Sequence, residues 1–190
     1  TLGLIAEEGV RGATVRAIAE RAEVTQGLIR HYFSTKEDLV LAAYTQHMDA
    51  LTEQTFAKAE GATPRARLAA LVVASVTPPV ADAASVALWA GFLTQVRQDA
   101  RMQEVHARSY HGFRDRLEAL IAEVLAQDGR AADSRDCRPL AIASNAVIDG
   151  LWLEGGALAD AFEEGELAAI AVQSVGAILG MNLTGTEAQE

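Results

Sequence analysis

The sequence is poor in the features that mark secreted, membrane-spanning or β-rich proteins. Of its 190 residues only Cys137 is a cysteine, which excludes a disulfide within the chain and fits a reducing cytoplasm. The longest apolar stretch, residues 68–76, is far too short to cross a bilayer, so we expect no membrane association. Strand-forming runs are scarce while alanine and leucine dominate, which predicts an all-α fold.

Positive charge is scarce as well. The chain carries 16 Lys and Arg against 26 Asp and Glu, a net charge of −10, and this balance at first disfavours binding to nucleic acid. The acidic excess is uneven, however. Residues 1–47 hold five basic and six acidic side chains, whereas residues 48–190 hold eleven and twenty. The first quarter of the chain therefore stays open to a nucleic-acid role, although it is not basic overall.

The most informative segment is residues 14–39, which predict two short helices around a tight turn. Thr14 can cap the first helix, which ends at residues 22–24, and Thr25 can cap a second helix over residues 26–32. Helices this short cannot bury much apolar surface alone. Joined by so brief a turn, they indicate a helix-turn-helix whose second helix enters the major groove of DNA. Double-stranded DNA is therefore the expected partner.

Cap signals and helix breakers divide the rest of the chain into longer helices. Ser34 and Glu37 match a capping box at the start of a helix that is expected to end near residue 60. Pro64 suits the first position of the next helix. The remaining segments are predicted as helices over residues 82–98, 99–127, 139–158 and 166–180, a polar loop over 128–138 and a frayed tail over 184–190.

The last two predicted helices, residues 139–158 and 166–180, are apolar on more than one side. A protomer covers one face of such a helix, so we expect a two-fold homodimer to cover the other. The sequence thus predicts two domains. These are a three-helix DNA-binding domain over residues 1–47 and a helical ligand-binding and dimerisation domain over residues 48–190.

Three motifs in the first domain carry a family resemblance. Thr14-Val-Arg-x-Ile-Ala, Ala22-x-Val-Thr-x-Gly-x-Ile and His31-Tyr-Phe-x-x-Lys-x-x-Leu39 together resemble the DNA-binding domain of the TetR-family regulators. The resemblance implies an all-helical homodimer whose C-terminal domain binds a small ligand that alters the affinity for DNA.

Each candidate DNA-binding residue has a chemical reason to contact DNA. Gln26 and Arg30 can reach base edges, glutamine pairing best with adenine and arginine with guanine. Gly27 lets the helix approach the duplex closely. The other candidates lie at helix N-termini or suit phosphate contact and backbone positioning; they are Thr14, Arg16, Thr25, His31, Tyr32 and Lys36. The alternative is that all of these are ordinary solvated residues on short helices.

The second half of the chain carries a further resemblance. Trp89-x-x-Phe92, Asp99 through His106-x-x-x-Tyr110, and Ile148-Asp-Gly-Leu-Trp-Leu153 look like the C-terminal domain of the BetI-type branch, which is named for choline-responsive repressors. This resemblance implies a repressor whose effector is a quaternary ammonium or another small organic cation.

A quaternary ammonium offers no N–H donor, so its recognition needs aromatic faces and a carboxylate. The candidate effector-binding residues are Trp89, Phe92, Tyr110, Phe113 and Trp152, with Asp149 or Glu154 as the countercharge. Two alternatives stay open. Aromatic residues at helical spacing commonly form core, and Asp149 can pair with Arg114 or Arg116, within one protomer or across the dimer interface.

Features of an enzyme are weak. His106 and His111 are five residues apart and lie on different sides of a helix, while His111 and Asp115 have suitable spacing but form only two ligands. Cys137 lies near an expected helix start, which would lower the pKa of its thiol, but no base is placed beside it. We therefore expect no metal, no cofactor and no catalysis.

The sequence as a whole predicts a cytoplasmic, homodimeric, ligand-responsive transcriptional repressor that binds a pseudo-palindromic operator. The alternatives are an activator, or a regulator with an apolar effector, an anionic effector or none. A helical enzyme is a more remote alternative.

Overall fold

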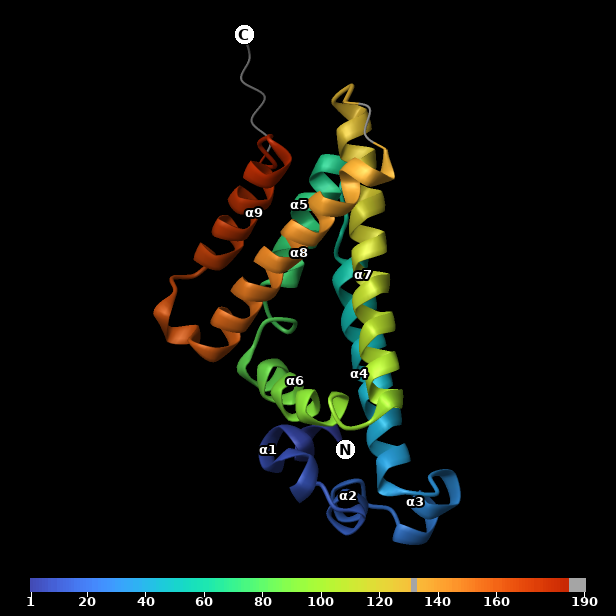
Figure 1. Cartoon of the computed structure of the whole chain (residues 1–190). Helices are drawn as coiled ribbons and strands as arrows, with labels where there is room; N and C mark the ends of the chain where they lie inside the picture. The colour runs from blue at the N-terminus through green and yellow to red at the C-terminus, as the bar shows by residue number, and fades with distance from the viewer. Residues whose placement is uncertain (131–132, 185–190) are drawn as a thin grey trace. The chain divides into compact units, whose positions relative to one another are not determined.

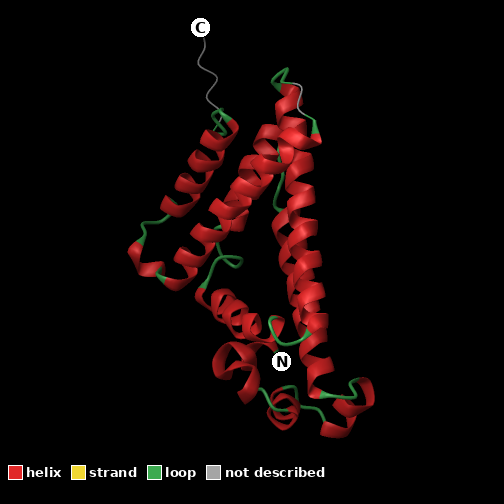
Figure 2. Ribbon diagram, in the orientation of Figure 1, coloured by secondary structure: helices red, strands yellow, loops and turns green. Residues whose placement is uncertain are grey.

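The fold is built from α-helices joined by short connections, as predicted (Figures 1 and 2). The computed structural model describes residues 1–130 and 133–184, and contains no strand within them. In chain order the elements are α1 (Leu2–Gly12), α2 (Val15–Arg21), α3 (Gln26–Tyr32), α4 (Lys36–Ala57), α5 (Pro64–Ser75), α6 (Ala83–Val96), α7 (Ala100–Gln127), α8 (Ser134–Ala157), the 3-10 turn η1 (Ala159–Ala161) and α9 (Glu166–Leu179).

The chain divides into two compact units that differ from the predicted domains. The first unit comprises Thr1–Leu51 and Ala84–Ser109, and the second comprises Thr52–Ala83 and Tyr110–Glu190. Both α4 and α7 contribute residues to each unit. The predicted division at residue 47 concerns function rather than packing, and it stays a prediction.

Tyr44 organises the core of the first unit. Its ring centroid lies 4.7 Å from that of Phe92 on α6, and its hydroxyl oxygen lies 2.6 Å from Nδ1 of His106 on α7. Burial lowers the pKa of His106, which favours the neutral imidazole, whose unprotonated nitrogen can accept a hydrogen bond from the hydroxyl. Three helices, α4, α6 and α7, thus meet at one buried side chain.

The core of the second unit is one continuous apolar cluster. Helix α8 packs against α9, and both pack against α5 (Figure 1). Leu71 of α5, Ile121 of α7 and Val175 of α9 are completely buried within this cluster. This core covers one apolar face of α8 and of α9. The prediction that a homodimer covers the other face stays a prediction.

The N-cap of α4 is Thr35, one residue later than the predicted N-cap Ser34. The backbone N–H of Asp38 donates to Oγ1 of Thr35, and the N–H of Thr35 donates to Oδ2 of Asp38, both at 3.1 Å. Thr35 and Asp38 therefore form the reciprocal pair that was predicted for Ser34 and Glu37. Asp38 is held for this role because its other carboxylate oxygen accepts from Arg101 at 2.8 Å.

The predicted loop over residues 128–138 is wrong in its second half. The carboxylate of Asp133 accepts hydrogen bonds from the N–H groups of Arg135 (2.7 Å) and Asp136 (3.2 Å), so it caps a helix that begins at Ser134. The sequence predicts that this helix begins at Pro139, but Pro139 lies inside α8. Residues 131–132 of the predicted loop and 185–190 of the predicted tail lie outside the described residues.

Candidate DNA interface and effector site

Recognition helix α3 is fixed at its start by the predicted caps. Oγ1 of Thr25 accepts a hydrogen bond from the N–H of Leu28, and Oγ1 of Thr14 accepts from the N–H of Ala17 at the start of α2, both at 3.1 Å. Both N-caps are confirmed. Because each hydroxyl oxygen acts as an acceptor here, its own O–H can still donate to a phosphate oxygen.

The turn between α2 and α3 has the hydrogen bonds of a Schellman motif, with a glutamate where glycine is usual. The N–H of Val24 donates to the carbonyl of Ala19 (3.0 Å), and the N–H of Glu23 donates to the carbonyl of Glu20 (3.2 Å). Glu23 has a φ of 55°, in the left-handed region. This conformation costs a residue with a Cβ about 1 kcal/mol, so the turn that sets the angle between α2 and α3 is strained.

Helix α3 exposes every side chain except that of Ile29. Gln26 and Arg30 lie four residues apart and share one edge of its outer face. Arg30 forms no ion pair with any residue that the structure describes. At the end of the helix, the rings of His31 and Tyr32 meet edge to face with centroids 5.1 Å apart, and Tyr32 is 72% exposed. The helix thus offers its predicted base-reading and positioning groups to a partner.

The structure gives no internal reason for a glycine at position 27. Its backbone is not in the left-handed region, and an added Cβ would meet only Oγ1 of Thr25, at an ordinary contact distance of 3.8 Å. Neither the conformation nor the packing of this chain therefore requires Gly27. The predicted reason for Gly27, close approach of the helix to a duplex, stays a prediction.

Two predicted phosphate contacts have partners within the chain. Nε of Arg16 donates to Oε1 of Glu20 at 2.9 Å, in an exposed pair of the kind that stabilises little. Nζ of Lys36 donates to the carbonyls of Val10 (2.6 Å) and Arg11 (3.3 Å), near the end of α1. Lys36 therefore ties the start of α4 to α1, a positioning role that the sequence did not indicate. Its contact with phosphate stays a prediction.

The predicted effector residues are divided between the two units. Trp89 and Phe92 lie on α6 in the first unit, where Phe92 is completely buried against Tyr44. The other four lie in the second unit, Tyr110 and Phe113 on α7 and Asp149 and Trp152 on α8. The second unit therefore holds all of the predicted charge and three of the five predicted aromatic residues.

Among the described acids of the second unit, Asp149 has the most perturbed pKa. Burial raises its pKa to about 6, while a hydrogen bond from Nδ2 of Asn145 to Oδ2 (2.9 Å) and the positive charge of Arg114 oppose the rise. A carboxylate that has lost part of its water interacts more strongly with a charged partner than an exposed one does. Asn145 was not predicted from the sequence, although its i, i+4 spacing to Asp149 was a usable signal.

The two arginines considered as partners of Asp149 behave differently. Arg116 pairs with Glu53 at 2.6 Å, and its guanidinium carbon lies 3.7 Å from the ring centroid of Phe56. Arg114 is close enough to Asp149 to lower its pKa, but it forms no ion pair with it. Asp149 thus has a basic neighbour, but its carboxylate forms no ion pair with any described residue.

Phe113 and Trp152 of the predicted aromatic set also contact other described residues. The ring of Phe113 meets that of Phe56 edge to face, with centroids 5.3 Å apart, and Nε1 of Trp152 donates to the carbonyl of Val80 at 2.7 Å. These contacts fix both rings and agree with the core-packing alternative. A role in enclosing an effector stays a prediction for all five aromatic residues.

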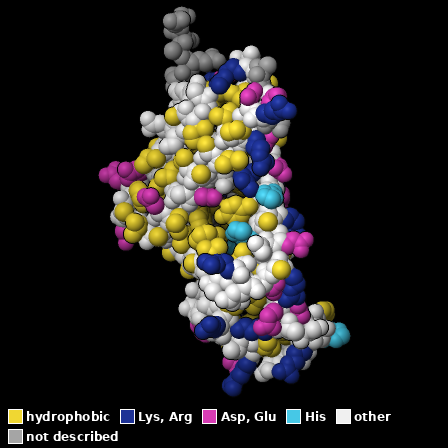
Figure 3. Space-filling model, in the orientation of Figure 1, with side chains coloured by type: hydrophobic (Ala, Val, Ile, Leu, Met, Phe, Trp, Pro, Cys, Tyr) yellow, Lys and Arg dark blue, Asp and Glu magenta, His cyan; other side chains and the backbone are white. Residues whose placement is uncertain are grey.

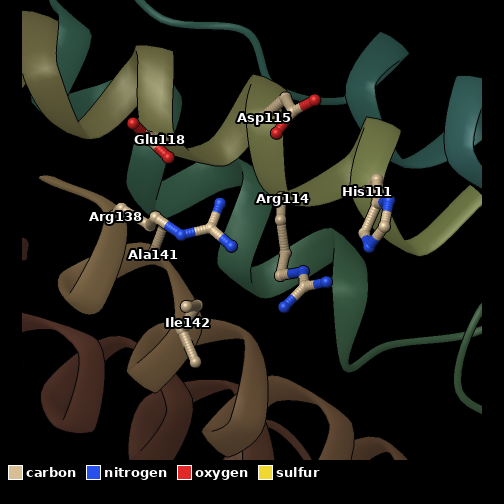
Figure 4. A pocket seen from close by; sticks show the side chains of 7 residues that line it. All are labelled: His111, Arg114, Asp115, Glu118, Arg138, Ala141 and Ile142. Carbon is tan, nitrogen blue, oxygen red and sulfur yellow. The ribbon is translucent and has the colours of Figure 1, made fainter. Parts of the chain in front are cut away.

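A small pocket of about 160 Å³ opens between α7 and α8 (Figure 4). Arg114 from α7 and Arg138 from α8 both line it, and neither forms an ion pair with a described residue. The lining is completed by His111, Asp115, Glu118, Ala141 and Ile142. Sequence reasoning missed Arg138 because it placed this residue in a loop; Asp133 was the signal that could have moved the helix start.

The thiol of Cys137 does not have the lowered pKa that its position near a helix start suggested. It is 1% exposed, and burial together with the negative charges of Glu118, Asp136 and Asp133 raises the pKa of its thiol. The predicted lowering is therefore wrong. The helix N-terminus is outweighed here by desolvation and by three nearby carboxylates.

Neither a metal cluster nor a membrane helix is found among residues 1–130 and 133–184. No three His, Cys, Asp or Glu side chains gather there to hold a metal ion. No helix in those ranges is long and apolar enough to cross a membrane.

A capped helix-turn-helix with an outward-facing second helix, in an all-helical chain, defines the class of DNA-binding transcriptional regulators. The model of the bacterial regulatory proteins of the TetR family matches residues 1–43, and the model of the BetI-type transcriptional repressor C-terminal domain matches residues 64–180. The chain belongs to the TetR family of transcriptional regulators, with a BetI-type C-terminal domain, and is not an enzyme.

Relatives and solved structures agree with this assignment. The chain is 31% identical to the HTH-type transcriptional regulator BetI of Burkholderia ambifaria over 160 residues, which cover 82% of this chain and 77% of the relative. A putative transcriptional regulator from Pseudomonas aeruginosa PAO1 superposes with a TM-score of 0.83 at 28% identity, over 94% of this chain and 86% of the other.

Two other solved structures share the fold and hold different ligands. A putative regulator from Saccharomonospora viridis, in complex with choline, has a TM-score of 0.71 at 20% identity and covers 95% of this chain and 92% of its own. FadR from Bacillus subtilis, in complex with stearoyl-CoA, has a TM-score of 0.69 at 21% identity and covers 94% and 93%. At this level of identity the likeness extends to the fold alone.

Proposed function

We propose that this chain is a cytoplasmic, ligand-responsive repressor that binds a pseudo-palindromic operator as a homodimer. The observation that carries the proposal is the outer face of α3, where five of the six side chains are exposed around a glycine that the chain itself does not need. Two such helices in a dimer would enter successive major grooves about 34–36 Å apart.

Dimerisation through α8 and α9 is supported by apolar side chains left exposed on these helices. Ile142 and Leu153 of α8 are 41% and 42% exposed, and Ile170 of α9 is 37% exposed. Hydrophobic side chains gather over this part of the second unit (Figure 3). A two-fold interface would cover the same residues on both protomers.

The proposed effector is a small organic cation that interacts with Asp149. The support is the carboxylate itself, which is half-buried, oriented by Asn145 and without an ion pair among the described residues. Tyr110 precedes Arg114 by one helical turn on α7, and Trp152 follows Asp149 by three residues on α8. Aromatic faces thus lie on the helices that bring Arg114 and Asp149 near each other.

An anionic effector is the second candidate, favoured by the pocket in Figure 4. Its two arginines come from different helices and lack ion-pair partners in the described part of the chain, so a carboxylate ligand could pair with both. Asp115 and Glu118 in the same lining weigh against it, because they repel an anion.

Operator binding is tested with a duplex selected by the full chain from a random-sequence pool. We expect the selected site to contain two half-sites related by a two-fold axis, and equilibrium sedimentation to give two protomers per duplex. A reporter promoter overlapping this site tests the direction of regulation, with lower expression supporting a repressor. Selection of no duplex would contradict the proposed function.

The effector class is tested by comparing choline with 3,3-dimethylbutanol, its uncharged carbon analogue. We expect choline to raise the thermal unfolding midpoint and to release the selected duplex, and the analogue to do neither. Equal effects of the two compounds would exclude charge recognition. Stabilisation by small carboxylates, lost in Arg138→Gln, would favour the anionic alternative instead.

A further inference from the structure

Exposed apolar side chains are concentrated in the helix-turn-helix. Eight large hydrophobic side chains are exposed in the described residues, and three of them, Val24, Leu28 and Tyr32, fall within nine residues of the chain. Leu28 is 46% exposed although the helix that carries it buries only Ile29. A two-turn helix depends on tertiary packing for its stability, so burial of Leu28 as well as Ile29 would stabilise α3.

The position of Leu28 on the helix is well defined. Its N–H is bonded to the capping Thr25, so it sits in the first, anchored turn of α3. At about 100° of rotation per residue, Gly27 and His31 lie opposite the buried Ile29. Gln26 and Arg30 then flank Gly27 on one side, and Leu28 and Tyr32 flank it on the other. The outer face is therefore divided into a polar edge and an apolar edge.

This division matches the chemistry of an A·T pair in the major groove. Adenine presents the N7 acceptor and the N6 donor that a glutamine can contact, and thymine presents a C5 methyl group beside them. Gly27 lies between the two edges, and an added Cβ there would point into open space apart from Thr25. The groove floor can thus approach the helix axis closely enough for a side chain as short as leucine to reach a base.

We infer that Leu28 is a specificity-determining residue that reads thymine by apolar contact with its C5 methyl group. The inference rests on the proposed operator binding and adds a chemical preference that neither Gln26 nor Arg30 supplies. Burying one methyl group contributes about 0.8 kcal/mol, which corresponds to about a fourfold change in affinity at each half-site.

The test removes the methyl group and the leucine separately and together. In the duplex selected by the protein, each thymine pair related by the two-fold axis is replaced by deoxyuridine, which lacks only the C5 methyl. Dissociation constants are measured by fluorescence anisotropy at fixed salt for the wild-type chain, for Leu28→Ala and for Leu28→Gln, which keeps the length of the side chain and removes its apolar end.

For one of these thymine pairs we expect the deoxyuridine duplex to bind the wild-type chain about fourfold more weakly per half-site than the thymine duplex does. Each of the two Leu28 variants should bind the two duplexes equally well. Val73→Ala, which truncates an exposed apolar side chain on α5, serves as the matched control and should retain the wild-type response. Circular dichroism checks that the variants keep their helix content and unfolding midpoint.

Two results would overturn the inference. One is that Leu28→Ala loses the same affinity, relative to wild type, for the thymine duplex and for the deoxyuridine duplex. Leu28 would then contact the sugar-phosphate backbone rather than the methyl group. The other is an undiminished methyl preference in both variants. In either case operator binding itself would persist, so this failure is distinct from the failure of the proposed function, in which no duplex is selected.

Discussion

The two units of the molecule differ sharply in charge. The first unit, which contains the helix-turn-helix, carries eight basic and nine acidic residues, whereas the second carries eight and seventeen. Electrostatic attraction to phosphate is therefore weak in one unit and reversed in the other. The comparison teaches that this regulator cannot rely on a basic surface. Under the proposed function, DNA binding then depends on a few well-placed contacts, which the proposed homodimer would double.

The largest expected effect is the loss of DNA affinity in Arg30→Ala. Arg30 is the exposed cation on the outer face of α3, and one bidentate contact with guanine contributes about 1 to 3 kcal/mol per half-site. Anisotropy with the selected duplex should show a loss of about tenfold or more and relaxed sequence preference. Arg97→Ala removes an equal charge from another exposed site of the first unit. Equal losses in the two variants would show that only overall charge matters.

The second prediction concerns Asp149→Asn, which probes the acidic unit. Because the folded-state pKa of this acid is raised from 3.8 to about 6, its contribution to stability is greatest below pH 4 and is lost as the pH rises through about 6. At pH 8 the variant should be more stable than wild type by about 1 to 2 kcal/mol after allowance for solvent screening. Urea unfolding at pH 5 and pH 8 measures the difference, which should shrink at the lower pH.

The same variant should lose its response to choline, since the proposed countercharge is gone while the acceptor for Asn145 remains. Asp115→Asn, an exposed acid on α7, is the matched control and should keep the wild-type response. If Asp149→Asn is more stable than wild type and still responds to choline, the buried carboxylate of Asp149 is not the countercharge of the effector.

The third prediction separates folding from binding at Gly27. Gly27→Ala should raise the free energy of unfolding by about 0.5 to 1 kcal/mol, because alanine favours helix and meets no clash within the chain. It should nevertheless weaken DNA binding about tenfold, since the added Cβ holds the duplex away. Gly112→Ala on α7, also with open space around the position, should show the gain in stability alone. Unchanged DNA binding in Gly27→Ala would contradict the proposed groove contact.

The smallest expected effect is that of Glu23→Gly in the turn before α3. Relief of the left-handed backbone should stabilise the chain by somewhat under about 1 kcal/mol, because glycine also gains freedom in the unfolded state. Thermal unfolding measures the change. Glu23→Ala removes the same carboxylate but keeps the Cβ, so a similar gain in that variant would assign the effect to charge rather than to backbone strain.

Local signals explain how much of the fold could be predicted from the sequence. Thr14 and Thr25 each precede a short helix without a competing cap, so α2 and α3 were predicted with their observed limits. At the start of α4 two adjacent residues, Ser34 and Thr35, are both good caps. The choice between them depends on Asp38, which Arg101 holds from a distant part of the chain. Such a tertiary contact leaves no local trace.

The candidate site divides in a similar way. The outward residues of α3 were predictable, because helical spacing fixes which side chains share a face. The positioning role of Lys36 was not, since it depends on how α1 ends near α4. Nor was the raised pKa of the Cys137 thiol, because Glu118 and the surrounding apolar side chains are brought to it only by folding. Helical spacing therefore predicts which side chains share a face. Burial and charged residues that are distant in the sequence determine the pKa and the partners of each side chain on it.

The division of the chain into units has a consequence for how such a regulator can be taken apart or recombined. Residues 84–109 supply Phe92 and His106, which cover and anchor Tyr44 of the first unit. A fragment that ended after the helix-turn-helix would leave that tyrosine without either neighbour. A chimera that joins the first unit of this chain to the second unit of a relative must therefore keep residues 84–109 together with residues 1–51, as one discontinuous unit.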